Sequence, residues 1–320
     1  MNWKDLKKLL NLDAHPRMAR FVSPGVALEI QPGFVAGARL NPRKRQVERA
    51  GVRQLETGAL NPSANRANVT NDAAVKRSVE EVMELVGSGG DPIGVLIPDA
   101  SVRVALLAFE ALPENRHEEE SLVRWRLREH LPYPPEEARL SYEVLTRQKE
   151  GAEVLGLAIR KSVLAEYEGM LEGINGGPEL VLPATAALLP LLPDEDGAQL
   201  LLHICPGSLT AVLVGFKRVR LWRTRQLGED PVGEEVAREA LRVLATCQDQ
   251  FGAAVQKLWF CARPPATREL KEQLAAALGR ELLTLPADAS AGSLPEGERE
   301  AFQQFGAPFA GLAANVIEKQ

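Results

Sequence analysis

The residue types best suited to chemistry in this chain are its histidines and cysteines, and only two of them stand close together. His203 and Cys205 are two positions apart on an expected strand, so both side chains point to one face and could supply half of a metal site. No second pair with ligand spacing accompanies them, and there is no HExxH or CxxC motif. The sequence therefore predicts no metal site and no catalytic residue. The other histidines and cysteines are scattered along the chain: His15, His117, His130, Cys247 and Cys261.

Composition and charge are those of an ordinary globular protein. Of 320 residues, 38 are basic and 43 acidic, and the formal charge of -5 gives no global attraction to nucleic acid. The basic stretch 124–128 is interpreted as a solvated helix face with Trp125 packed inward. The most apolar stretch, 180–193, is interrupted by prolines and is shorter than the roughly 20 residues that a membrane-spanning helix needs.

The N-terminal segment, residues 1–21, has a different character from the rest. It places Trp3 and Leu6 at helical spacing among Lys4 and Lys7, the pattern of a short basic amphipathic helix. Two interpretations stay open, a helix packed on the body of the protein and contact of residues 1–20 with a membrane surface. The odd number of cysteines and the lack of a signal peptide indicate a reduced, cytoplasmic compartment.

The elements that position His203 and Cys205 form a pattern that occurs twice. In each half of the chain three strands are followed by a helix, which indicates an internal repeat and an α/β fold of two lobes. A strand-rich subdomain interrupts the first half. The expected units are a first lobe at 22–193 with the insertion at 91–160, a second lobe at 194–298, and a C-terminal helix at 299–320 that returns to the first lobe. The expected strands are Val26–Ile30, Phe34–Leu40, Val52–Glu56, Ile93–Pro98, Leu200–Cys205, Leu209–Phe216 and Val219–Gln226.

Five short segments carry a resemblance to a known family. They are VLIP at 95–98, ALP at 111–113, HLPYP at 130–134, SYEVL at 141–145 and PFAGLAA at 308–314. In order and spacing they resemble the type IV pilus assembly protein PilM family, and more distantly the cytoplasmic domain of GspL and the division protein FtsA. The resemblance implies an actin-like fold, that is, a duplicated ribonuclease H-like fold of two lobes with a small inserted α/β subdomain.

The first hairpin departs from the nucleotide-binding pattern of that superfamily. Where the family has Gly-x-Asp-x-Gly, this chain reads Ala27, Glu29 and Gln31. Gln31 adds a side chain where the loop should be bare, and Pro32 removes a backbone donor that a phosphate would use. The basic residue expected in the next strand is missing, with Arg39 three residues late as a candidate substitute.

The second lobe departs in the same way. Where Asp-x-Gly-x-x-x-Thr is expected, the chain reads His203, Cys205 and Leu209, and Thr210 is one place late. A histidine cannot replace a carboxylate that orders a magnesium-bound water. The adenosine contact should be Gly-Gly, and the residues at 262–265 are Ala262, Arg263 and two prolines.

These losses, together with the recognisable insertion, favour a scaffold over an enzyme. The resemblance implies a cytoplasmic adaptor, peripheral at the inner membrane, that binds the cytoplasmic tail of a PilN-like protein near the insertion. No cofactor is expected, and ATP with magnesium should bind weakly or not at all. The alternative is an active actin-like ATPase or kinase with unusual phosphate loops. The sequence leaves open whether the protein forms a homo-oligomer and whether it serves a pilus or a secretion system.

Overall fold

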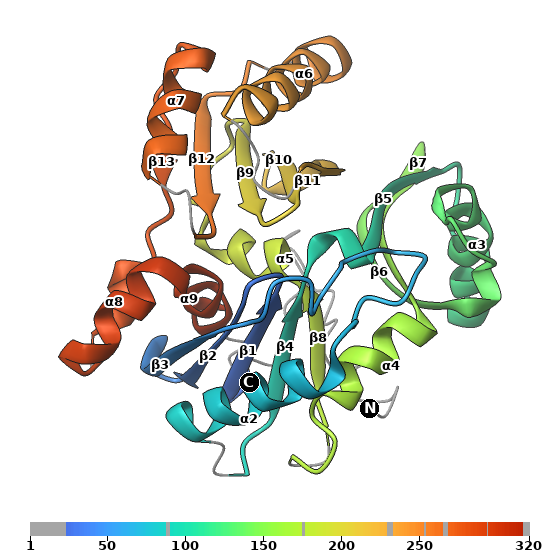
Figure 1. Ribbon diagram of the computed structural model, residues 1–320. Coiled ribbons are helices and arrows are strands. Elements are labelled where there is room, and N and C mark those ends of the chain that lie inside the picture. The colour runs from blue at the N-terminus through green and yellow to red at the C-terminus, as the bar shows by residue number, and fades with distance from the viewer. Residues whose placement is uncertain are drawn as a thin grey trace.

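The computed structural model describes residues 24–87, 90–174, 177–228, 233–252, 254–264, 268–292 and 294–315. The predicted basic helix at 1–21 lies outside these residues. Two five-stranded sheets, one in each lobe, have the same strand order, and a three-stranded sheet stands beside them (Figure 1). The prediction of two lobes built on an internal repeat is confirmed.

The first lobe contains a sheet with the strand order β3-β2-β1-β4-β8. The first three strands are antiparallel neighbours, while β4 pairs in parallel with β1 and with β8. The hairpin between β1 and β2 turns at Gly33, whose φ of 90° is a conformation that glycine adopts without strain. The strands and helices are β1 (Val26–Gln31), β2 (Phe34–Asn41), β3 (Gln46–Gln54), α2 (Asp72–Val86), β4 (Ile93–Ile97), α4 (Lys161–Gly169), β8 (Leu180–Pro183) and α5 (Ala184–Leu188).

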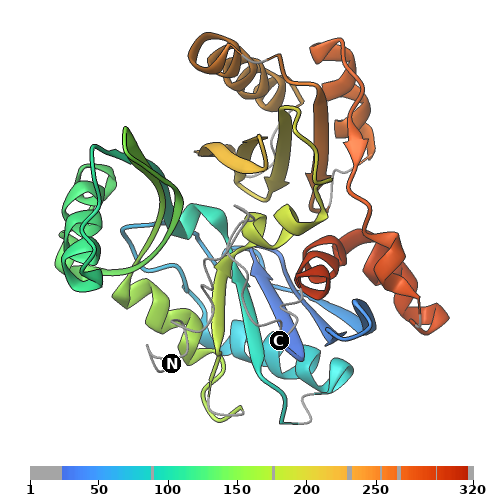
Figure 2. The same cartoon turned by 180° about the vertical axis from the view of Figure 1, so that it is seen from behind.

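The second lobe repeats this arrangement as β11-β10-β9-β12-β13. Its three leading strands are antiparallel, and β12 pairs in parallel with β9 and with β13. Helices α6 and α7 pack against each other, and Figure 2 shows both on the outer side of this sheet. The elements are β9 (Gln199–Cys205), β10 (Ser208–Gly215), β11 (Arg218–Gln226), α6 (Gly233–Phe251), β12 (Lys257–Ala262), α7 (Arg268–Leu278) and β13 (Leu283–Thr284).

The period of two along β1 and β9 divides each strand between two environments. Val26, Leu28 and Ile30 belong to the core that includes α2, so Ala27, Glu29 and Gln31 point to the opposite face. In β9 the corresponding core residues are Leu200, Leu202 and Ile204, which leaves His203 and Cys205 on the opposite face. The duplicated strands therefore present their polar residues on corresponding faces.

The insertion has a small core of its own. Helix α3 (Arg116–Leu127) covers a sheet of order β5-β7-β6, formed by β5 (Val102–Phe109), β6 (Ala138–Gln148) and β7 (Gly151–Arg160). The predicted insertion began at residue 91 and included the strand Ile93–Pro98, and this assignment was wrong. That strand is β4, which is buried along its whole length because it lies between β1 and β8 in the first lobe.

The chain returns to the first lobe earlier than expected. The single C-terminal helix expected at 299–320 is two helices within the described residues. The first, α8 (Glu296–Phe305), packs on β3, where Glu298 accepts hydrogen bonds from Arg49 Nε at 2.6 Å and the backbone N–H of Ala50 at 2.7 Å. The predicted end of the second lobe at 298 is therefore too late. The last helix, α9 (Ala307–Ala314), packs on α5, β2 and β3.

Two further expectations need correction. The third strand was expected at Val52–Glu56, but β3 starts at Gln46, because the whole length of β2 is available for pairing. Trp125 was expected to pack inward, yet it is 50% exposed, with the Arg128 guanidinium 4.6 Å from its ring centre.

Among the described residues, no helix is long and apolar enough to cross a membrane.

Candidate functional site

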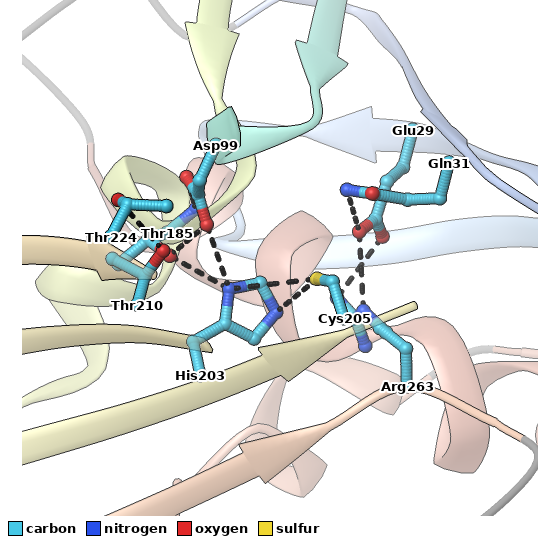
Figure 3. Close-up of polar contacts among 9 residues, drawn as sticks. All are labelled: Glu29, Gln31, Asp99, Thr185, His203, Cys205, Thr210, Thr224 and Arg263. Carbon is cyan, nitrogen blue, oxygen red and sulfur yellow. Dashed lines mark hydrogen bonds and ion pairs between the residues drawn. The ribbon is translucent and has the colours of Figure 1, made fainter. Parts of the chain in front are cut away.

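Polar residues gather where the carboxyl ends of parallel strands from both lobes meet. Strands β1, β4 and β8 of the first lobe run parallel, as do β9 and β12 of the second. In such sheets ligands bind beyond the carboxyl ends of the strands. Figure 3 shows the side chains that converge there. They are Glu29 and Gln31 on β1, Asp99 after β4, Thr185 after β8, His203 and Cys205 on β9, Thr210 on β10, Thr224 on β11, and Arg263 after β12.

An ion pair between Glu29 and Arg263 joins the two lobes. Arg263 Nε donates to Glu29 Oε1 at 3.1 Å, and Nη2 is 3.0 Å from Oε2. Gln31 Nε2 also donates to Oε1, at 3.3 Å, and Arg263 Nη1 donates to the carbonyl of Gln304 at 3.4 Å. The two charged side chains are 0% and 1% exposed, so water screens their attraction very little.

A second chain of hydrogen bonds links Asp99 to Cys205. Asp99 accepts from the backbone N–H of Thr185 at 3.1 Å and from its hydroxyl at 2.5 Å. Because that hydroxyl donates to Asp99, it accepts from Nδ1 of His203, which is 2.7 Å away. The ring then carries its proton on Nδ1, and Nε2 directs a lone pair at Cys205 Sγ, 3.4 Å away.

Burial controls the chemistry of the two thiols beside this site. Burial raises the pKa of Cys205 well above its ordinary value, and the carboxylates of Asp99 and Glu29 raise it further. Burial also raises the pKa of Cys261, although the nearby Arg263 opposes the effect. Both groups are therefore neutral thiols near pH 7, and neither is an activated nucleophile.

The structure brings only some of the predicted nucleotide-loop positions together. Glu29, Gln31, His203, Cys205 and Arg263 meet at the lobe boundary, whereas the three apolar members do not take part in the polar network. Ala27 and Leu209 belong to the hydrophobic cores, and Ala262 packs against the core of the second lobe.

Arg39 and Thr210, the two residues that stand near missing nucleotide-binding positions in the sequence, have other partners in the structure. Arg39 pairs with Asp91 at 2.8 Å and with the carbonyls of Val86 and Gly87, at the end of the sheet away from the β1–β2 turn, so it does not replace the missing basic residue. The Thr210 hydroxyl is 3.1 Å from that of Thr224.

These residues do not fit a magnesium-bound triphosphate. A phosphate loop needs bare backbone and free N–H groups, whereas Gln31 is fully buried here and donates to Glu29. The Glu29 carboxylate is engaged by Arg263 and that of Asp99 by Thr185. The polar side chains of this cluster thus bind one another.

Sequence reasoning missed Asp99 and Thr185. Each follows the end of a strand by two residues, in Ile97-Pro98-Asp99 and Leu182-Pro183-Ala184-Thr185. Their position after parallel strands was a signal that could have found them. Their pairing could not have been found, because it depends on β4 and β8 being neighbours across a gap of 86 residues.

A separate pocket lies on the insertion, outside this buried cluster. It has a volume of about 350 Å³, and it carries both signs of charge. Lys161 donates to the carbonyl of Glu136 at 2.7 Å, and Arg124 binds Glu120 at 3.2 Å. The lining residues come from α3, the segment before β6, β6 itself and the start of α4: Glu120, Arg124, Glu136, Ala138, Arg139, Leu140 and Lys161.

Comparison with known proteins shows the fold. No family model and no curated protein matches the chain. Among solved structures, a chain of the "PilM-PilN type IV pilus biogenesis complex" superposes with a TM-score of 0.76 at 20% identity, covering 94% of this chain and 100% of that one. The cytoplasmic domain of EpsL, an inner membrane component of the type II secretion system of Vibrio cholerae, superposes with a TM-score of 0.49 at 12% identity, covering 92% and 94%. The chain thus has the expected actin-like fold of two lobes.

Proposed function

We propose that this chain is a PilM-like scaffold of a type IV pilus or a related secretion machine. In this proposal it lies at the cytoplasmic face of the inner membrane and binds the cytoplasmic tail of a PilN-like protein. The observation that carries the proposal is the likeness to a chain of the PilM-PilN complex. That likeness covers 94% of the 320 residues, which leaves out about 19 of them. This number is smaller than the length of the insertion, so the insertion is largely included.

The insertion offers the surface for such a tail. Its pocket lies beside the start of α4, with carboxylates, guanidinium groups and an ammonium group around Leu140. An extended peptide gains affinity from main-chain hydrogen bonds and from a few side chains held in pockets. Neither source of affinity requires a catalytic group.

The absence of ATP hydrolysis is part of the same proposal. Opening the nucleotide site would require separating Glu29 from Arg263, and each would then be a charge without its partner. Separating the pair costs free energy, because water screens its attraction very little. Nucleotide binding would have to supply that free energy before any net affinity appeared.

Titration of the tail tests the partner. The ligand is a synthetic peptide of the cytoplasmic tail of the single-span membrane protein encoded by the neighbouring reading frame. We expect binding at micromolar strength or tighter, and at least a tenfold loss in Lys161→Glu, because the exposed Lys161 lines the pocket. The matched control is Lys76→Glu on α2, which lies in an exposed ion pair with Asp72. Equal affinity in both variants would place the docking surface elsewhere.

A second titration tests the nucleotide. Calorimetry with Mg-ATP should give no saturable binding in the micromolar range, because side chains fill the place of the phosphates. Micromolar affinity that is lost in a Glu29 or Asp99 variant would instead support the active ATPase or kinase.

A further inference from the structure

We propose that Glu29, His203 and Cys205 form a buried site for one zinc-type divalent metal ion that bridges the two lobes. The proposal is independent of the partner tail. Spacing along the chain showed only His203 and Cys205. The third donor comes from the other lobe, 174 positions before His203, so only the fold brings it close.

The positions of the three donors suit such an ion. Their ligand atoms all lie within 4.8 Å of one another, and all three residues are buried. Zinc binds sulfur at about 2.3 Å and imidazole nitrogen at about 2.0–2.1 Å, so tetrahedral ligands are about 3.5 Å apart. Cys205 Sγ and His203 Nε2, both on β9, are 3.4 Å apart, which matches this spacing.

The surrounding hydrogen bonds prepare the donors for a metal. Ligating histidines generally donate their other N–H to an oxygen that fixes the tautomer. Here the Thr185 hydroxyl accepts from Nδ1, and that hydroxyl is itself held by Asp99, so the Nε2 lone pair faces Cys205. Among the described residues around this cluster, no group other than Cys205 competes for Nε2.

The two oxygens of the Glu29 carboxylate have different contacts. Oε1 accepts hydrogen bonds from Arg263 Nε and Gln31 Nε2. Oε2 lies 3.0 Å from Arg263 Nη2 but accepts no hydrogen bond, although the residue is 0% exposed. A metal ion at Oε2 would have to share this oxygen with the Arg263 guanidinium.

The charges of the cluster also favour a cation. Among the described residues, this buried cluster holds two carboxylates, Glu29 and Asp99, and one guanidinium, that of Arg263, which pairs with Glu29. A divalent ion adds two positive charges, and binding to Cys205 releases the thiol proton, which adds one negative charge. The buried cluster then becomes neutral.

The test measures metal content and ligand type in the full chain. Because the donors are buried, tag-free protein is produced in medium supplemented with zinc or with cobalt, so that the ion is present during folding. We expect native mass spectrometry to find about one zinc per chain after dialysis. The cobalt form should show thiolate-to-cobalt charge-transfer absorption, a signature that an adventitious surface carboxylate site does not give.

Variants identify the donors. Cys205→Ala should lose the charge-transfer absorption and the bound metal, whereas Cys247→Ala, which removes an equally buried thiol from helix α6, should keep both. Thr185→Val should weaken binding about 10–100-fold through the orientation of His203. Metal-free wild-type protein would overturn the proposal. An unchanged cobalt spectrum in Cys205→Ala, or equal loss of metal from both cysteine variants, would also overturn it.

Discussion

Replacing Arg263 by methionine removes the charged group that joins the two lobes while keeping a long side chain. Glu29 then keeps a hydrogen bond from Gln31 but has no positive partner, at a position with 0% exposure. Removing one member of a buried ion pair costs about 3–5 kcal/mol, because the remaining charge stays out of water. We expect Arg263→Met to lower the free energy of unfolding by this amount, with no discount for solvent screening.

The assay is urea unfolding followed by tryptophan fluorescence, with a chelator present so that bound metal does not contribute. The control is Arg53→Met, which breaks the ion pair with Glu81 on the surface, where the two side chains are 41% and 45% exposed. Surface pairs of this kind contribute up to about 1 kcal/mol. The double variant Glu29→Met, Arg263→Met should recover most of the loss, since no unpaired charge remains in the interior.

Two results would refute this reasoning. If Arg263→Met lost no more stability than Arg53→Met, the pair would be hydrated in solution and the lobes would separate there. If the double variant were no more stable than the single one, the cost would come from lost packing of the arginine side chain and not from the isolated carboxylate.

Two further predictions concern packing and ionisation. Gly311→Ala should detach α9, because the added Cβ would overlap the carbonyl oxygen of Ala187. Limited proteolysis should then release the C-terminal segment. The control is Gly297→Ala, which has nothing near its added Cβ and should leave the proteolysis pattern unchanged. Burial raises the pKa of Cys247 from 9.0 to about 11, so the stability contributed by this neutral thiol is complete below pH 9 and is lost as the pH rises through about 11. Urea midpoints on both sides of this range should show the loss in wild type, and a smaller loss in Cys247→Ala; equal losses would contradict the assignment.

Hydrophobic periodicity predicted most of the elements because burial is regular where two layers cover a sheet. Helix α2, for example, begins at Asp72 after the cap Asn71, as expected from the apolar spacing that follows. Strand β3 was displaced because its residues are only partly buried at the edge of the sheet. The start of α8 was predicted three residues late, because only Phe302 and Phe305 on it are buried, too few for a clear helical period.

The site was predicted one residue at a time but not as a network. Glu29 and Arg263 were each interpreted as the loss of a nucleotide contact, and their pairing across 234 positions follows only from the packing of the lobes. The closeness of Glu29 to Cys205 also follows only from the packing of the lobes, so the sequence could not predict it. A departure from a family pattern shows what a position no longer does, whereas its new partner depends on the fold.

The packing of α9 on α5 has a consequence for synthesis of the chain. Helix α5 ends at Leu188 and α9 starts at Ala307, so the surface that joins them is incomplete while the intervening residues are translated. At about 5–20 residues per second this delay lasts about 6–24 s. The sheet of the second lobe is continuous in sequence from Gln199 to Thr284 and needs no later segment for its strands. We therefore expect the contact between α5 and α9 to form last, after the strands of both five-stranded sheets have been translated.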